Sequence, residues 1–263
     1  MAAKNAAPAA EAPELGCDGN CLARLEKAGK FRFETSTGQV PVLNDLTFQI
    51  HRGEFTALLG ASGSGKSTVL EVLSGLETLD SGKVFIAGQD TTHLTDGKAT
   101  QMRRKHVGTV YQSGNLLPAL TVRQNLLLPL SLASRRFEKA RFDDVVAAFA
   151  LDNLLERLPS ELDKSARQRT AIARAVLSGV DLLLADEPTA ELGSRAALEI
   201  LSLLRMCIRE FGQTVLLATH DASAAAYSDR VLLLVDGHVS GEISSPSLQS
   251  VLLGIEAMGS GLS

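Results

Sequence analysis

The stretch that decides the fold is GASGSGKST, at residues 60–68. It fits the pattern G-x-x-x-x-G-K-[ST], and its surroundings fit as well. The apolar run FTALL (55–59) precedes it, and a helical pattern of apolar residues follows through residue 76. Glycines allow a backbone to wrap around a polyphosphate with its N–H groups pointing inward, at the positive end of a helix. The stretch therefore predicts a phosphate-binding loop between a buried strand and a helix.

The polar residues of this loop have expected roles. Lys66 brings a positive charge to the β- and γ-phosphates, and Ser67 brings a hydroxyl oxygen to Mg²⁺. The alternative, a glycine- and serine-rich turn with a solvated lysine, does not account for the strand before it and the helix after it. The loop residues expected to hold the nucleotide are Gly60, Ser62, Gly63, Ser64, Gly65, Lys66, Ser67 and Thr68.

A second group of polar residues follows two later apolar runs. Asp186 and Glu187 come directly after LLLA (182–185), and His220 comes directly after TVLLAT (214–219). Ligands of parallel sheets bind beyond such strand ends. Asp186 is suited to hold Mg²⁺, and Glu187 is suited to polarise a water for attack on the γ-phosphate. An acidic pair at a strand end is usually a solvated turn or a helix cap, but the phosphate loop favours the functional interpretation. A lone histidine at such a position is usually structural, but beside a γ-phosphate site His220 can hydrogen-bond the phosphate and sense its loss.

The order of apolar runs predicts the fold class. Continuous apolar strands alternate with helical patterns, which is typical of an α/β sheet covered on both faces, here with antiparallel strands added early in the chain. Residues 120–175 carry no strand pattern and are expected to be helical, with breaks at Pro129 and Pro159.

The first 29 residues are rich in Ala, Pro and Glu, and we expect them to form a disordered leader. Cys17 and Cys21 lie in this leader. They form either a metal or redox pair or two reduced thiols on a mobile tail, since no second ligand pair follows at zinc-site spacing.

Composition restricts the class of protein. The chain has 263 residues, 45% of them hydrophobic, enough for one large domain with its own core. A formal net charge of -4 offers no basic field for nucleic acid. No apolar stretch is long enough to span a bilayer, and the start MAAKNAAPAAEAPELG lacks the pattern of a secretory signal. We therefore expect a cytoplasmic chain that binds no nucleic acid and meets a membrane only through a partner.

With these motifs in place, residues 30–240 resemble the ABC (ATP-binding cassette) ATPase family. VYQS (110–113), followed by NLLP and LTV, is similar to the family's Q-loop, which implies that Gln112 is a ligand of Mg²⁺ and water. The resemblance makes His220 the switch histidine and Phe33 the aromatic residue that stacks on adenine. The alternative for Phe33 is a core residue of a strand.

The resemblance also implies a division of the chain. It gives a P-loop NTPase core with an antiparallel β subdomain at residues 30–113 and 176–240, a helical subdomain at 114–175, and a C-terminal tail at 241–263. Chain length and the NLLP sequence are most similar to the ATPases of lipoprotein-releasing (Lol) and macrolide-exporter (MacB) systems. Those ATPases work as dimers beneath membrane subunits and are often called mechanotransmitters.

One motif departs from the family. The helix sequence QRTAIARA (168–175) is present, but the preceding LSGGQ-type signature reads Leu162-Asp163-Lys164-Ser165-Ala166. In the family this segment reaches the γ-phosphate bound by the other subunit, so Asp163 would bring a carboxylate toward an anion. Gly193 also stands where the family has an aspartate that touches the partner. Both changes fall on surfaces offered to a partner.

Three functional hypotheses follow from the sequence. The first is an ATP- and Mg²⁺-dependent motor subunit on the cytoplasmic face of the inner membrane. It would bind integral membrane permease subunits and a second ATPase subunit, as a homodimer or a heterodimer. The second is a subunit that binds ATP and hydrolyses it poorly, with a structural or regulatory role. The third is a soluble ABC protein of DNA repair or translation, which the absence of coiled-coil, zinc and tandem-cassette insertions disfavours.

Overall fold

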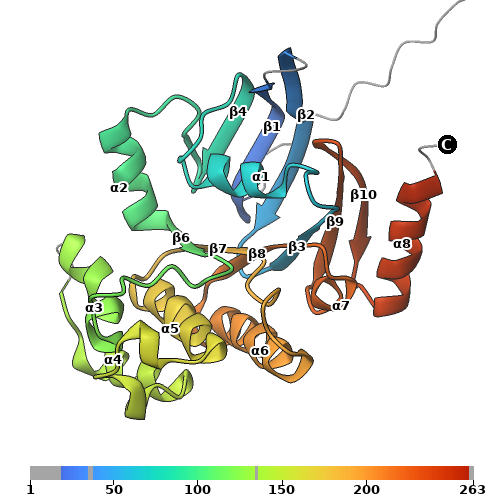
Figure 1. The fold of residues 1–263 in the computed structure, drawn as a ribbon. Helices are drawn as coiled ribbons and strands as arrows, with labels where there is room; N and C mark the ends of the chain where they lie inside the picture. The colour runs from blue at the N-terminus through green and yellow to red at the C-terminus, as the bar shows by residue number, and fades with distance from the viewer. Residues whose placement is uncertain (1–18, 35–37, 134–135, 261–263) are drawn as a thin grey trace, which may run out of the picture.

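Two sheets form the centre of the computed structural model, which describes residues 19–34, 38–133 and 136–260 (Figure 1). The larger sheet has six strands in the order β10-β9-β3-β8-β7-β6, and all are parallel except β10, which is antiparallel to β9. Its strands are β3 (Phe55–Leu59), β6 (Val107–Val110), β7 (Leu182–Asp186), β8 (Thr214–Thr219), β9 (Arg230–Val235) and β10 (His238–Ser244). The expected α/β fold with a mainly parallel sheet is confirmed.

The smaller sheet is antiparallel and has the order β2-β1-β4-β5. Its strands are β1 (Cys21–Glu34), β2 (Gly38–His51), β4 (Ser81–Ile86) and β5 (Gln89–Asp90). Because β1 begins at Cys21, the expectation of a disordered leader through residue 29 is wrong from Cys21 onward. Leu22 and Leu25 of β1 are buried, so this part of the chain contributes to the core. Residues 1–18, with Cys17, lie outside the described residues.

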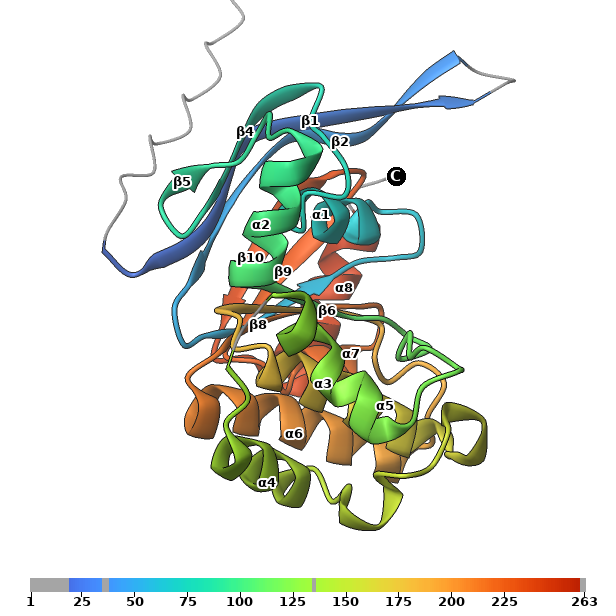
Figure 2. The same cartoon turned by 90° about the vertical axis from the view of Figure 1, so that its left-hand side faces the viewer.

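Helices cover both faces of the larger sheet. The smaller sheet, α1 (Lys66–Leu73) and α2 (Asp96–His106) lie on one side, and α3 (Val122–Leu132), α4 (Lys139–Ala148), α5 (Lys164–Leu177) and α6 (Ser194–Phe211) lie on the other (Figures 1 and 2). The alternation along β8 produces this division: Val215 and Leu217 pack with the α3–α6 side, and Leu216 and Ala218 pack with the other. Two short 3₁₀ helices, Asp152–Leu154 and Pro159–Glu161, connect α4 to α5.

The helix α3 continues through Pro129, where the sequence predicts a break. Its start is fixed by a capping box, in which Thr121 Oγ1 accepts from the Gln124 N–H and Gln124 Oε1 accepts from the Thr121 N–H. Farther along, the N–H of Ala133 still bonds to the carbonyl of Pro129. The proline therefore removes one donor without ending the helix.

The last described segment forms a helix, α8 (Leu248–Ser260), that follows the short α7 (Ala222–Ala225) and the hairpin of β9 and β10. Val251 of α8 is fully buried in a cluster with Leu233 of β9 and Ala225 of α7. The interpretation of residues 241–263 as a tail is therefore wrong for α8, which is part of the packed fold. None of the helices in the described part of the chain has both the length and the apolar character needed to cross a membrane.

Candidate functional site

The phosphate loop joins the end of β3 to the start of α1. Gly63 and Gly65 have φ angles of 84° and 104°, in the left-handed region that favours glycine. A Cβ atom on Gly65 would lie 2.8 Å from the carbonyl oxygen of Val42, so no larger residue fits there. Gly65 is also the N-cap of α1, which directs the N-terminal end of this helix at the loop. The local structure is thus a strand, a glycine-dependent loop and a helix.

The turn between β9 and β10 supports the loop, and strand β2 supports that turn in the same way. The N–H of Gly237, in the turn between β9 and β10, donates to the Ser64 carbonyl at 3.1 Å. The Gly237 carbonyl in turn accepts from the N–H of Asn44 on β2 at 2.9 Å. A Cβ atom on Gly237 would collide with the carbonyl of Val42. The loop shape is therefore set by β2 and the β9–β10 hairpin as well as by its own glycines.

Lys66 is 7% exposed and lies across the loop. Its Nζ donates to the carbonyl of Gly60 at 2.8 Å and to that of Ala61 at 2.9 Å, and lies 4.0 Å from Glu187 Oε1. Burial lowers the pKa of Lys66, while the charges of Glu187 and Asp186 act in the opposite direction. The ammonium group is thus held at the loop by carbonyl oxygens that phosphate oxygens can replace.

Asp186, at the end of β7, meets the start of α1. The Ser67 hydroxyl hydrogen-bonds the Asp186 carboxylate. Burial raises the pKa of Asp186 and so does the charge of Glu187, whereas the Ser67 hydrogen bond and Lys66 lower it. A carboxylate that is costly to bury and a hydroxyl beside it are hard oxygen ligands, which suit Mg²⁺. The described residues contain no group of three His, Cys, Asp or Glu side chains placed to hold a metal.

Glu187 has an unusual backbone. Its φ angle is 46°, a left-handed value that is rare for a residue other than glycine. Its Oε1 lies 2.8 Å from Nδ1 of His220, and its Oε2 accepts from the Thr219 hydroxyl at 3.4 Å. The strained turn after β7 therefore brings a carboxylate, a histidine at the end of β8 and Lys66 together. Strain of this kind is found where a side chain must be aimed at a site.

A cavity of about 630 Å³ collects most of the residues that the sequence singles out. Gln112, just beyond β6, lies in its wall together with the end of β7 and the loop. The expected site residues that line this cavity are Ser62, Gly63, Gly65, Lys66, Ser67, Thr68, Gln112, Asp186, Glu187 and His220. These ten residues, expected from separate parts of the sequence, therefore lie around one cavity.

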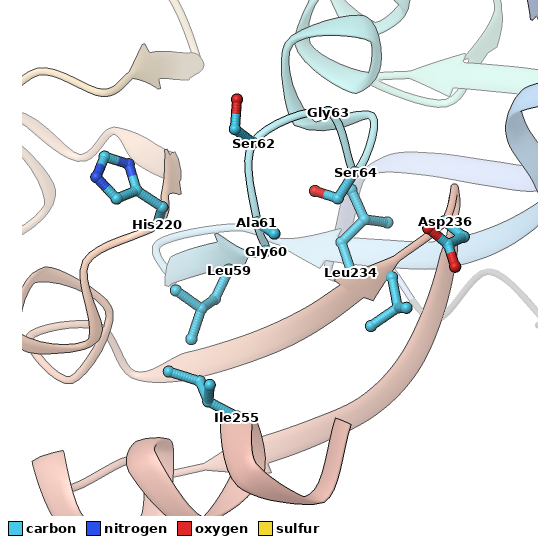
Figure 3. A pocket seen from close by; sticks show the side chains of 11 residues that line it. Leu59, Gly60, Ala61, Ser62, Gly63, Ser64, His220, Leu234, Asp236 and Ile255 are labelled. Carbon is cyan, nitrogen blue, oxygen red and sulfur yellow. The ribbon is translucent and has the colours of Figure 1, made fainter. Parts of the chain in front are cut away.

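Three expected residues lie elsewhere or are not described. Gly60 and Ser64 line a second cavity of about 440 Å³, which lies between the loop, the end of β9 and Ile255 of α8 (Figure 3). This cavity shares Ser62, Gly63 and His220 with the first. Ser64 is buried, and its backbone carbonyl is the one that accepts from the N–H of Gly237. The backbone of Phe33 pairs with Gln39 in the β1–β2 hairpin, and its side chain lies outside the described part of the chain.

Arg32, which no sequence motif predicted, also lines the cavity of about 630 Å³. Its Nη2 lies 3.2 Å from the Thr68 hydroxyl and 3.3 Å from Glu71 Oε2, both on α1. A basic residue beside the aromatic Phe33 was the available signal. It was missed because nothing in a single sequence shows that β1 passes over α1.

The altered signature segment begins α5. Asp163 is the N-cap of this helix, and its Oδ1 accepts from the N–H of Ala166 at 2.6 Å. Gly193, the second altered position, is exposed and is the N-cap of α6. Whether Asp163 opposes a phosphate held by a second subunit stays a prediction.

A phosphate loop, an acidic strand end and a histidine at the carboxyl edge of one sheet define a nucleoside triphosphatase of the α/β class. The chain belongs to the ABC transporter family, whose sequence profile matches residues 43–190. It is 35% identical over 209 residues to the bacitracin export ATP-binding protein BceA of Halalkalibacterium halodurans, covering 79% of this chain and 83% of that protein.

Two other relatives are named for related systems. One is the lipoprotein-releasing system ATP-binding protein LolD of Francisella tularensis, 35% identical over 209 residues, with 78% of this chain and 90% of that protein covered. The other is the macrolide export ATP-binding/permease protein MacB of a Shewanella species, 38% identical over 218 residues. That match covers 82% of this chain but 34% of MacB. The resemblance to Lol- and MacB-type ATPases is confirmed.

The solved structures agree. A dimeric structure of a post-hydrolysis state of the ATP-binding cassette MJ0796 bound to ADP and Pi has a TM-score of 0.78 and 32% identity, and the match covers 86% of this chain and all of that one. The expected class, an ATPase that serves as the ATP-binding subunit of an ABC transporter, is therefore confirmed.

Proposed function

We propose that this chain is the motor subunit of a transport or mechanotransmission complex, and that ATP binding and hydrolysis in its cavity move membrane subunits. The observation that carries the proposal is the single cavity that joins the phosphate loop, Asp186, Glu187, His220 and Gln112. Relatives named for bacitracin export, macrolide export and lipoprotein release support a role in transport. In this proposal the chain lies at the cytoplasmic face of the inner membrane, bound to integral membrane permease subunits.

The cavity residues divide the work of holding ATP and Mg²⁺. Lys66 exchanges the two loop carbonyls for oxygens of the β- and γ-phosphates, and the loop N–H groups donate to the phosphates. Ser67, Asp186 and Gln112 supply oxygen ligands for Mg²⁺, which offsets phosphate charge when it is bound. Phe33 is the proposed stacking partner of the adenine.

Glu187 is the proposed general base. Its carboxylate lies beside both Lys66 and His220, so it can accept a proton from a water directed at the γ-phosphate. His220 shares this carboxylate and is the proposed hydrogen-bond partner of the γ-phosphate. When the γ-phosphate leaves, His220 would keep only its contact with Glu187. In this proposal the change in the contacts of His220 distinguishes the ATP-bound site from the site after hydrolysis.

A second ATPase subunit is the proposed partner across the cavity, since a solved relative with the same fold is dimeric. In this arrangement residues 114–175 act as the helical subdomain that carries the signature segment to the partner's nucleotide. The alternative function is a subunit that binds ATP and hydrolyses it poorly. Asp163, Lys164 and Ser165 stand where the family's signature has a serine and two glycines, and this change favours that alternative.

The decisive experiment is to purify the chain with the membrane proteins that it binds in its native cell. ATP turnover is then measured with and without those proteins. A motor subunit should turn over ATP faster in the complex, and Glu187→Gln should remove the difference. A complex that binds MgATP and shows no turnover above the Glu187→Gln background supports the hydrolysis-poor alternative. A chain that copurifies with no membrane protein contradicts both.

A further inference from the structure

One carboxylate joins three segments around the nucleotide cavity. Glu191, in the loop after β7, pairs through Oε2 with Nζ of Lys164 at 3.0 Å. Its Oε1 lies 3.5 Å from Nε2 of Gln112, at the outer limit of a hydrogen bond. Lys164 is the first residue of α5, and Gln112 follows β6. Glu191 thus bridges the acidic strand end, the segment of Gln112 and the altered signature segment.

A buried side chain ties the same three segments beneath Glu191. Gln168 of α5 is 2% exposed, and its Nε2 donates to the carbonyls of Tyr111 at 3.0 Å, Gln112 at 2.9 Å and Pro188 at 2.9 Å. This contact fixes the backbone on both sides of Gln112. It does not orient the Gln112 side chain or the exposed first turn of α5, which are the two groups that Glu191 contacts.

The charges at the start of α5 explain why Lys164 needs a partner. A lysine in the first turn of a helix faces the positive end of the macrodipole, which is unfavourable. Asp163 is engaged with the N–H of Ala166, so its nearer oxygen is used for capping. The carboxylate of Glu191 offsets the charge of Lys164 from another element. The lysine in the signature segment and the glutamate after β7 are therefore best understood as a pair.

The contact with Gln112 has a chemical consequence. An amide that donates its NH₂ group to Glu191 keeps its oxygen as the atom available to a cation, and oxygen is the ligand that Mg²⁺ requires. We propose that Glu191 is a positioning residue for ATP hydrolysis: it orients the Gln112 amide for Mg²⁺ and, through Lys164, holds the start of α5 to the nucleotide cavity. The inference rests on the Mg²⁺ role proposed above for Gln112.

Two substitutions separate the two contacts. Glu191→Gln removes the ion pair and keeps an oxygen that can accept from Gln112, whereas Glu191→Leu removes both. The matched control is Glu156→Gln, which breaks the exposed Arg123–Glu156 pair, 2.8 Å long and outside the cavity lining. Calorimetry of ATP binding over a Mg²⁺ titration measures the effect of the contact between Glu191 and Gln112. Amide hydrogen exchange of residues 164–167 without nucleotide measures the effect of the ion pair between Glu191 and Lys164.

Glu191→Leu should reduce the gain in ATP affinity that Mg²⁺ gives by two- to tenfold, the range of one ordinary hydrogen bond. Glu191→Gln should leave that gain within twofold and still speed exchange at the start of α5, as should Lys164→Gln. Combining Lys164→Gln with Glu191→Gln should add little further exchange, because both remove one ion pair. The control should change neither measurement.

The inference is overturned if Glu191→Leu keeps the full Mg²⁺ gain, or if the Lys164 and Glu191 effects on exchange simply add. Neither readout needs turnover or a membrane protein. A chain that binds ATP but fails the copurification experiment above would therefore count against the proposed motor function and leave this test intact. A wild-type chain whose ATP affinity does not respond to Mg²⁺ would refute the role of Gln112 and this inference with it.

Discussion

Replacing Lys66 with methionine separates what its ammonium group does for ATP from what it does for the fold. The side chain is 7% exposed, and its two hydrogen bonds go to carbonyls of the phosphate loop. Methionine keeps an unbranched apolar stem of similar length and removes the charge. We expect Lys66→Met to fold normally and to lose most of its affinity for MgATP.

The size of the loss follows from one charge-assisted contact. A hydrogen bond to a charged group contributes about 1.5–3 kcal/mol. Each 1.4 kcal/mol or so changes an equilibrium constant tenfold, so MgATP affinity should fall about 10- to 150-fold. This range is a lower bound for the loss of affinity. Without the positive charge of Lys66, the negative charges of Glu187 and Asp186 repel the phosphates more strongly.

The thermal stability of the nucleotide-free Lys66→Met variant should not fall with its ATP affinity. Burial lowers the pKa of Lys66, so the folded chain binds this proton less tightly than the unfolded chain does. The unfolded state then holds more protons between the lowered pKa and the ordinary one, and stability rises with pH through that window. Below the window the buried charge opposes folding. The nucleotide-free variant should therefore have a Tm at or above that of wild type near neutral pH. Its stability should not show the rise with pH that deprotonation of Lys66 gives to wild type.

Isothermal calorimetry with MgATP and a thermal scan without nucleotide make both measurements. Lys139→Met is the control, because Lys139 pairs with Asp143 on the exposed surface of α4. A variant that binds MgATP within threefold of wild type would refute the phosphate contact. Weak binding accompanied by a large fall in Tm would show instead that the ammonium group holds the loop together.

Three further predictions concern the chemistry, the cavity rim and the partner surface. Glu187→Gln should reduce turnover nearly to background with MgATP affinity within about threefold of wild type, since shape is kept and the base is lost; retained turnover would move the base elsewhere. Arg32→Gln should weaken MgATP binding about two- to fivefold, as expected for an exposed charge, and Arg32→Lys should restore most of it; equal loss in both variants would mean that the guanidinium shape is what matters. Restoring residues 162–166 to Leu-Ser-Gly-Gly-Gln in a Glu187→Gln background should increase ATP-dependent dimerisation, measured by light scattering. The exchange of Asp163 for serine keeps an N-cap for α5 and removes a carboxylate whose repulsion of a phosphate at about 4 Å amounts to roughly 4 kcal/mol at an effective dielectric of 20. Tight ATP-dependent dimers without the restoration would show that the altered segment already works.

The grouping of the candidate site residues around one cavity was predictable because each sequence motif is local. A short glycine-rich loop and two polar strand ends each carry their signal within a few residues, and the parallel sheet brings them together. Arg32 and the Gln112–Glu191 contact carry no such signal. Gln112 and Glu191 are 79 positions apart, and the pairing of β6 with β7 together with the packing of α5 against the strand ends makes them neighbours.

The two wrong boundaries have different physical causes. The register of β1 against β2 shifts at three places between Leu25 and Phe31, and Lys27 has a left-handed φ of 46°. These irregularities break the alternation by which a strand is recognised, so its first half resembles a leader. The helix α8 follows a serine-rich turn and carries few charges. Its inclusion in the fold depends on burying Val251 against β9, which only tertiary structure reveals.

The position of β3 has a consequence for synthesis of the chain. This strand carries the phosphate loop, yet its two neighbours in the sheet, β8 and β9, both come from the last third of the sequence. The turn that braces the loop, at Asp236 and Gly237, comes later still. A ribosome therefore exposes the complete glycine-lysine motif long before the strands that hold it, and long-range pairings of this kind form slowly. A nascent or truncated chain that ends before β9 would carry every residue proposed to bind ATP but would lack the strand and the turn that support the phosphate loop.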